Sequence, residues 1–258
     1  MMSNCKKLAA VAGAAIVMAM AATASARADE ARVFTYSFNI GAYSDYMFRG
    51  LSQSDDRPVL QGGADIGYGI FYAGVWLSKT EENFNAAPLE TDFYAGVKPV
   101  LGPVTFDLGV LYYGYPSQDG AISLGLDVDY YEFKAAASYS PITNLTATVL
   151  FYYTPDYSFE TGRGTTIEGN IAYSLPQFWV FTPTISATLG YFDVEKQWST
   201  EVDGTPVFDV TYWNAGLALA VEKITIDLRY YGSNIDVNIP NTTSSDDRFV
   251  AGVKIALP

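Results

Sequence analysis

Residues 34–49 alternate between two kinds of side chain. The even positions from Phe34 to Phe48 are mainly aromatic or aliphatic, whereas the odd positions are mainly polar, small or charged. A period of two places these two sets on opposite faces of an extended strand. An acidic break follows at 53–57, and the alternation resumes at Val59. If this unit recurs with regular spacing, it determines the architecture of the whole chain.

The same alternation recurs along the chain. In one segment Val104, Phe106 and Leu108 oppose Thr105 and Asp107, which fits the period of a strand better than that of a helix. The connections at 51–57, 80–89, 116–125, 154–164, 193–206 and 233–247 are long and polar, and the others are short apart from the aromatic turn 175–182. The predicted strands are 33–50, 58–69, 71–79, 90–100, 104–115, 126–140, 145–153, 165–174, 183–192, 207–220, 223–232 and 248–257.

Long and short connections in regular alternation are typical of an outer-membrane β-barrel, with long extracellular loops and short periplasmic turns. Closure is required because hydrocarbon cannot satisfy the backbone groups at a sheet edge. Only 17% of residues are charged, and after the N-terminal segment no apolar run approaches the ~20 residues of a spanning helix. The sequence predicts one all-β domain over 29–258, a transmembrane antiparallel β-barrel. We expect twelve strands, with ten or fourteen as alternatives, and both termini in the periplasm.

The N-terminus has the pattern of a secretory signal peptide. Lys6 and Lys7 precede the apolar segment 8–22, and small residues then form overlapping cleavage sites that end at Ala26 and Ala28. We predict that 1–28 is a signal peptide cleaved after Ala28, with cleavage after Ala26 as the alternative. This pattern indicates export from a Gram-negative cytoplasm.

Loss of that segment would remove Cys5, and with it all thiol chemistry. The basic residues would fall from 15 to 12 against 28 acidic ones, a net charge of −16 that argues against nucleic acid as a partner. The chain has no histidine, which excludes Ser–His and Cys–His nucleophiles. It also has no zinc spacing, calcium loop or phosphate-binding glycine motif. We therefore expect no enzyme, cofactor or metal site.

Charged residues inside the predicted strands fall on the polar face. Buried without partners they would be costly, so they either pair with one another or line water. Twelve strands enclose a narrow lumen, which leaves two alternatives: a water-filled pore, or a plugged barrel whose charges pair. The predicted lumen-lining residues are Asp45, Arg49, Gln61, Asp65, Asp92, Lys98, Asp107, Glu132, Lys134, Glu168, Asp227, Arg229 and Lys254. Among them, Arg49 is predicted to affect ion selectivity if the lumen is open.

Aromatic residues gather where strands meet the long loops. Amphipathic rings suit a membrane interface, so these residues predict an outer aromatic girdle, with Phe178 and Trp179 in the opposite one. The girdle residues are Tyr46, Phe48, Tyr112, Tyr113, Tyr130, Tyr131, Tyr152, Tyr153, Tyr191, Phe192, Tyr230 and Tyr231. The long loops themselves are acidic. These acids either favour cations and neutral solutes at the mouth, or keep the surface soluble and bind divalent ions among lipopolysaccharide phosphates.

The block from Ser44 to Ser54, SDYMFRGLSQS, is followed by QGG at 61–63 and FYAGVW at 71–76. In these segments the chain resembles the TorF family of proteobacterial outer-membrane porins. The resemblance is clearest over the first three strands, and it implies a pore-forming barrel without implying a solute. Many bacterial barrels end in an aromatic residue that the barrel-assembly machinery recognises, whereas this chain ends at Pro258, which we expect to lie past the last strand.

Together these observations predict a porin for the passive diffusion of small hydrophilic solutes across the outer membrane. The alternative is a plugged structural or adhesive barrel that acts through its acidic loops. The expected partners are outer-membrane lipid and lipopolysaccharide, small solutes, and the assembly machinery during biogenesis. The sequence leaves the oligomeric state and the identity of the solute open.

Overall fold

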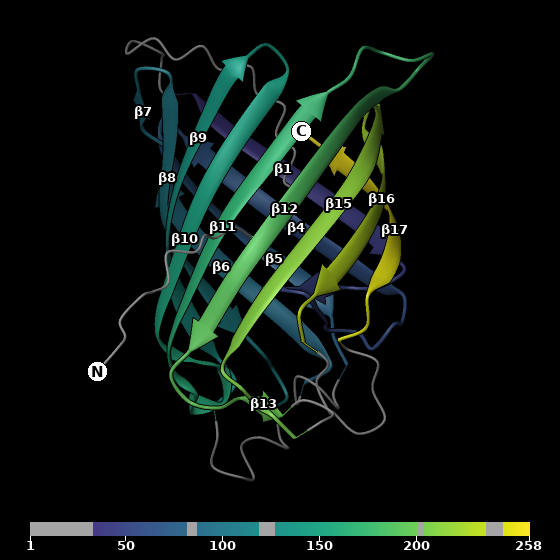
Figure 1. The fold of residues 1–258 in the computed structure, drawn as a ribbon. Coiled ribbons are helices and arrows are strands. Elements are labelled where there is room, and N and C mark those ends of the chain that lie inside the picture. Colours follow the sequence, from purple (N-terminus) through teal and green to yellow (C-terminus); the bar gives the residue numbers. More distant parts are fainter. Residues whose placement is uncertain (1–32, 82–86, 119–126, 201–203, 236–244) are drawn as a thin grey trace, which may run out of the picture.

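The computed structural model describes residues 33–258 except 82–86, 119–126, 201–203 and 236–244. Twelve antiparallel strands form one closed barrel (Figure 1), which confirms the predicted fold class. β17 pairs with β1 from Leu257↔Phe38 to Gly252↔Tyr43 and so closes the sheet. The barrel strands are β1 (Phe34–Tyr43), β4 (Val59–Tyr68), β5 (Phe71–Lys79), β6 (Leu89–Val97), β8 (Val104–Gly114), β9 (Tyr130–Ile142), β10 (Leu145–Tyr157), β11 (Gly162–Ser174), β12 (Thr182–Val194), β15 (Asp209–Val221), β16 (Ile224–Ser233) and β17 (Arg248–Leu257).

The two ends of the barrel differ as the sequence predicts. One end, the short-turn end, carries the connections 69–70, 98–103, 143–144, 175–181 and 222–223, and the other, the long-loop end, carries the rest. The predicted long loop 154–164 is an exception. There β10 continues to Tyr157 through a bulge, β11 begins at Gly162, and only a single 3₁₀ turn, η1 (Ser158–Glu160), joins them. Other connections carry the short strands β7 (Val100–Leu101), β13 (Ser199–Thr200) and β14 (Pro206–Val207).

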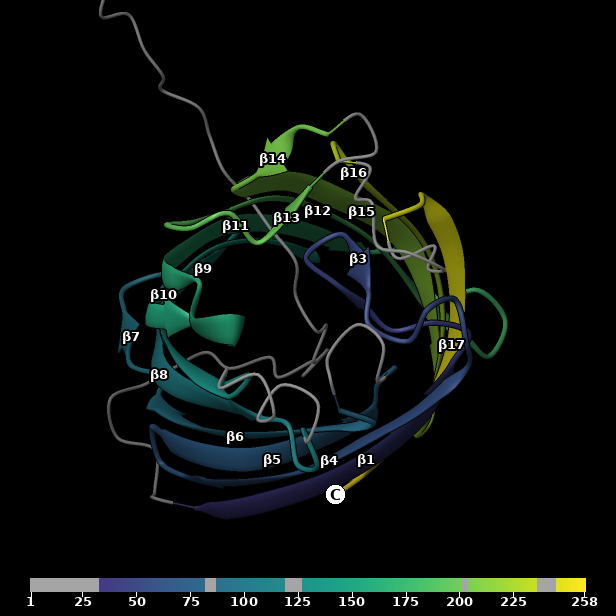
Figure 2. The ribbon, with the colours of Figure 1, turned by 90° about the horizontal axis from the view of Figure 1, so that it is seen from below.

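The first strand ends earlier than predicted. β1 stops at Tyr43 rather than at residue 50, and the chain then turns into the barrel. There β2 (Met47–Phe48) and β3 (Leu51–Ser52) pair with each other and with no barrel strand. Figure 2, which looks in from the long-loop end, shows β3 inside the ring of strands. We call residues 44–58 the inward hairpin, and Phe48 and Arg49 its tip.

The two faces of the wall follow the period of two. Apolar residues such as Phe38, Ile40 and Phe93 are exposed on the outside, and polar residues face in. Adjacent aromatic residues therefore point to opposite faces: Tyr112 is 41% exposed outside, whereas Tyr113 is 5% exposed inside. The predicted girdle is wrong for its inward members, which are Tyr46, Phe48, Tyr113, Tyr130, Tyr152, Phe192 and Tyr231.

At the short-turn end, Phe178 and Trp179 are largely exposed in the aromatic turn, as a girdle position requires. β17 ends at Leu257, so the expectation that Pro258 lies past the strand is confirmed. Within the described residues, no helix is long and apolar enough to cross a membrane. The predicted signal peptide, 1–28, lies outside the described residues.

Candidate functional site

A cavity of about 640 Å³ occupies the barrel from the short-turn end to the hairpin tip, and we call it the vestibule. Its lining includes Gly69 and Ile70 at the short-turn end and Phe48 and Arg49 at the other. The predicted lumen residues that lie along it are Asp45, Arg49, Gln61, Asp65, Asp92, Lys98, Asp107, Lys134, Glu168, Asp227, Arg229 and Lys254. The remaining one, Glu132, is buried against the tip instead.

Charges on the vestibule wall pair both between neighbouring strands and within one strand. On β8, Asp107 accepts hydrogen bonds from Lys134 Nζ at 2.7 Å and from the Tyr72 hydroxyl at 2.6 Å. Lys98 Nζ lies 3.9 Å from the same carboxylate. Six places round the ring of strands, on the opposite wall, β16 carries an ion pair between Asp227 and Arg229 at 3.0 Å. The vestibule is thus lined by both signs of charge.

Several lumen tyrosines lie flat against the wall over a glycine of the next strand. Asp65, Gly74 and Tyr94 are register partners on β4, β5 and β6. The Tyr94 ring covers Gly74, where an added Cβ would lie 2.5 Å from it, and its hydroxyl donates to Asp65 at 2.6 Å. Gly74 therefore leaves the ring room to lie along the wall rather than across the lumen. The same register order recurs at Glu168, Gly190 and Tyr212, and at Asp227, Gly252 and Tyr43.

Asp45 holds the base of the inward hairpin. Its Oδ1 accepts hydrogen bonds from the hydroxyls of Ser52 and Ser54, both at 2.6 Å, and from the Tyr46 backbone N–H at 2.7 Å. Its Oδ2 lies 2.7 Å from Nη1 of Arg248 at the start of β17. One carboxylate thus ties the hairpin to itself and to the barrel wall.

At the tip, the Arg49 guanidinium crosses the lumen to Glu132 on β9. Its Nη2 donates to both carboxylate oxygens at 2.8 Å, and both side chains are almost fully buried. Burial disfavours the charged guanidinium, but Glu132 together with the neighbouring Tyr157, Tyr212 and Tyr130 more than offsets this, and the pKa of Arg49 lies well above its usual value. The backbone turns at Gly50, whose φ is +81° and whose added Cβ would lie 2.7 Å from Tyr212 Cβ. A larger residue there would clash with the wall.

Aromatic rings surround the guanidinium. Its centre lies 4.7 Å from the Phe48 ring centroid and 5.1 Å from that of Phe192, distances suited to cation–π attraction. A continuous row of rings, the aromatic collar, runs round this level of the wall. Its members are Tyr113, Tyr130, Tyr157 and Phe192, with successive ring centroids 4.5, 4.7 and 4.8 Å apart.

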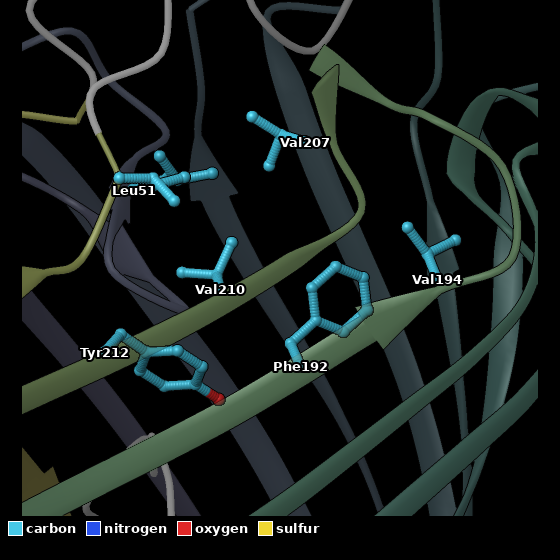
Figure 3. Close-up of a cluster of buried hydrophobic side chains, with 7 residues drawn as sticks. Leu51, Phe192, Val194, Val207, Val210 and Tyr212 are labelled. Carbon is cyan, nitrogen blue, oxygen red and sulfur yellow. The ribbon is translucent and has the colours of Figure 1, made fainter. Parts of the chain in front are cut away.

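The tip separates the vestibule from a second cavity. This loop-side cavity has a volume of about 330 Å³ and is lined by loop residues such as Ser158 and Ser199. Phe48 and Arg49 line both cavities. Leu51 of the hairpin joins a buried apolar cluster with Phe192, Val194, Val207, Val210 and Tyr212 (Figure 3). The hairpin is therefore packed into the long-loop half of the barrel.

Several buried acidic side chains lie around the Arg49 guanidinium at the tip. Electrostatic interactions connect Asp92 to Glu90 and Glu132, and Glu168 to Arg49 and Glu132. Glu90 accepts a 3.3 Å hydrogen bond from Tyr46. Burial, and then the charge of Glu90, raises the pKa of Tyr46 well above its usual value, so its hydroxyl keeps the proton that it donates. The level of the hairpin tip, which we call the throat, thus gathers buried acidic side chains around Arg49.

Sequence reasoning missed the lumen tyrosines, together with Glu90 and Arg248. The period of two could have placed Tyr72 and Trp76 in the lumen, because both alternate with the outward residues Phe71 and Leu77. Arg248 had no local signal, since its partner Asp45 lies 203 residues away. Among the described residues, no group of three or more acidic, histidine or cysteine side chains is placed to hold a metal ion.

Residues 27–255 match the model of a family described as "Bacterial protein of unknown function (Gcw_chp)". No curated protein matches the sequence. Among solved structures, a KdgM porin has a TM-score of 0.55 at 10% identity, covering 86% of this chain and 99% of that chain. A NanC porin has a TM-score of 0.53 at 11% identity, covering 87% and 100%. A KdgM porin described as in complex with disordered oligogalacturonate also has a TM-score of 0.53, at 10% identity, covering 88% and 100%. These likenesses show a shared barrel fold.

Proposed function

The chain belongs to the Gcw_chp family of bacterial proteins of unknown function, and we propose that it is an outer-membrane porin for the passive diffusion of small hydrophilic solutes. The observation that carries this proposal is the charge-lined vestibule of about 640 Å³ inside a closed barrel. Mixed charges that face a cavity favour a water-filled interior, because paired groups there keep part of their hydration. The shared fold of the KdgM and NanC porins supports the same proposal. Assignment to the TorF porins stays a prediction.

The outside of the barrel supports placement in a membrane. Each barrel strand carries exposed large apolar residues, for example Phe38, Val149, Leu189 and Phe249. The barrel strands have 9–13 residues, which matches the ~9–11 residues that a tilted strand needs to cross the hydrocarbon. By this proposal the long loops are extracellular and both termini are periplasmic. Outer-membrane fractionation, with protease accessibility of the long loops on intact cells, tests the location and the orientation.

The acidic throat supports a preference for cations and neutral solutes. Glu90, Asp92, Glu132 and Glu168 lie at the level where Arg49 supplies the opposing charge. Where these carboxyl groups are ionised, their charge raises the local concentration of cations and lowers that of anions. This places the expected cation bias at the throat as well as at the acidic loops. Such a throat is a poor match for an acidic oligosaccharide.

The plugged barrel remains the second candidate, because a specific observation favours it. The hairpin buries Leu51 among apolar wall residues, and its Arg49 is paired and dry. A segment packed in this way resembles a protein core more than a pore loop. In that case the acidic loops would carry a structural or adhesive role.

Single-channel recording of the refolded protein in planar bilayers separates the two candidates. A porin gives steps of conductance in wild type and a reversal potential on the cation side. Arg49→Ala should raise the conductance and increase the cation preference, because it removes the cation that pairs with Glu132 at the throat. The matched control is Arg57→Ala, since Arg57 is half exposed at the hairpin base and pairs with Glu81 at 2.6 Å. No conductance in wild type or in Arg49→Ala, in several salts, would favour the plug.

A further inference from the structure

The loop-side cavity has the composition of a ligand site. Its lining includes the collar rings Tyr130, Tyr157 and Phe192, together with Phe159 and Trp198. Its volume of about 330 Å³ lies at the lower end of the range for small-molecule sites, which are mostly apolar with a few placed polar groups. Its size and its aromatic walls suit one planar ring system.

Two lining residues present buried hydrogen-bond donors that the described part of the chain leaves wholly or partly unsatisfied. Arg49 Nη2 donates to Glu132, while its Nε and Nη1 are buried without a well-aligned hydrogen bond and the Tyr157 hydroxyl interacts with the rest of the guanidinium. The indole Nε1 of Trp198 is likewise buried and without a partner. Buried donors are normally satisfied, so an incompletely satisfied set around one cavity indicates an absent acceptor. The ligand must therefore bring the acceptors, since guanidinium and indole have none to offer.

Trp198 is held in place by its own backbone. Its N–H donates to the Val207 carbonyl at 3.1 Å, beside the short β13–β14 pairing, and the ring packs against the cluster that contains Leu51 and Phe192. The indole thus lies between the long-loop end and the hairpin. A fixed donor of this kind orients a ligand at little cost in side-chain entropy.

The charge around the cavity decides the class of ligand. Arg49 is already neutralised by Glu132, and Glu168 lies close enough to interact with both. The adjoining segments add the acidic Asp156, Glu160 and Glu195 and the basic Arg163 and Lys196, so acidic side chains still outnumber basic ones. A carboxylate ligand would meet this excess of negative charge. We propose that the loop-side cavity binds a small planar aromatic solute that carries a carbonyl oxygen as hydrogen-bond acceptor and no net negative charge.

Calorimetric titration of the refolded protein in detergent tests this proposal with three probes of one shape. 4-Hydroxybenzamide is neutral and has a carbonyl acceptor, 4-hydroxybenzoate has the same outline with a negative charge, and p-cresol lacks the carbonyl group. The amide should bind at least about tenfold more tightly than either of the other two. Trp198→Phe keeps the ring and removes the donor, so the amide should bind about fivefold to tenfold more weakly, as expected for one lost neutral hydrogen bond.

The matched control is Trp213→Phe, because Trp213 lies on the outside of β15, where its ring packs on Tyr230. It should leave the affinity unchanged, and heat-modifiable electrophoretic mobility shows whether each variant is folded. Absence of binding by wild type, equal losses in both variants, or tighter binding of the benzoate would each overturn the proposal. The titration needs no open pore. Binding without conductance would therefore support the ligand site and contradict the porin proposal. Conductance without binding would support the porin proposal and contradict the ligand site.

Discussion

The two halves of the barrel lumen are built from the same alternating strands and differ in what fills them. Near the short turns, charges such as Asp107 and Lys134 line a vestibule of about 640 Å³. Near the long loops, the inward hairpin and the aromatic collar fill the lumen and leave about 330 Å³. The wall alone therefore does not determine how open a barrel is. The inserted hairpin buries the ion pair at its tip away from water, whereas the ion pairs of the vestibule wall face a cavity.

The largest expected effect on stability comes from the buried ion pair between Arg49 and Glu132. Glu132→Leu removes the partner of Arg49 and leaves a buried, uncompensated guanidinium, which should cost about 3–5 kcal/mol. The hairpin should also become more mobile and raise the conductance, because this ion pair is the polar contact that joins its tip to β9. Urea unfolding in detergent, followed by the loss of heat-modifiable mobility, measures the stability.

The matched control for that variant is Glu81→Leu, which breaks the ion pair with the half-exposed Arg57. An exposed pair contributes about 0–1 kcal/mol, so this change should be small. Equal losses in the two variants would mean that the hairpin tip is as hydrated as its base. The contrast between the two halves would then be wrong.

The next largest effect on stability is expected at the glycines that are covered by tyrosine rings on the lumen wall. In Gly190→Ala the new Cβ would lie 2.3 Å from the ring of Tyr212, which is 1% exposed and has no space to move into. In Gly74→Ala the Cβ would lie 2.5 Å from Tyr94, but that ring borders the vestibule. Overpacking in a tight site costs about 1–3 kcal/mol. We expect the upper end of that range for Gly190→Ala and roughly 1 kcal/mol for Gly74→Ala.

The control for both glycine variants is Gly62→Ala, where the nearest atom to an added Cβ is the Asn39 carbonyl oxygen at 3.2 Å. The same unfolding assay ranks the three variants. If Gly74→Ala proved as costly as Gly190→Ala, the rings of the vestibule would be as confined as those beside the hairpin.

Most of the wall could be predicted from the sequence because its signal is local. Alternation over 34–43 and 104–114 fixes which side chains face in, and the lengths of the connections fix the order of the strands. The hairpin could not be predicted in this way. Ser44, Tyr46 and Phe48 continue the alternation past the end of β1, and what turns the chain inward is the set of donors around Asp45.

One of those donors, Arg248, comes from the other end of the chain. The placement of Arg49 against Glu132 is non-local for the same reason. The sequence therefore predicted which residues face the lumen, and it could not predict which of them would be dry. Adjacent aromatic residues such as Tyr112 and Tyr113 illustrate the same limitation of sequence reasoning. Their clustering predicts a membrane interface, but the period of two places one residue of each pair on the inward face.

The smallest effect on stability is expected for Asp107→Asn. This variant is also the most direct test of whether ions pass through the vestibule. Lys134 and Lys98 would lose their carboxylate partner, which in a hydrated site should change the free energy of unfolding by less than about 1 kcal/mol. The two freed cations should instead shift the reversal potential toward anions in a salt gradient. Asp209→Asn is the control, because Asp209 is exposed where β15 meets the long loops. If both variants shift selectivity equally, the acidic mouth controls entry. If only Asp107→Asn does so, ions pass through the vestibule and its wall charges select among them.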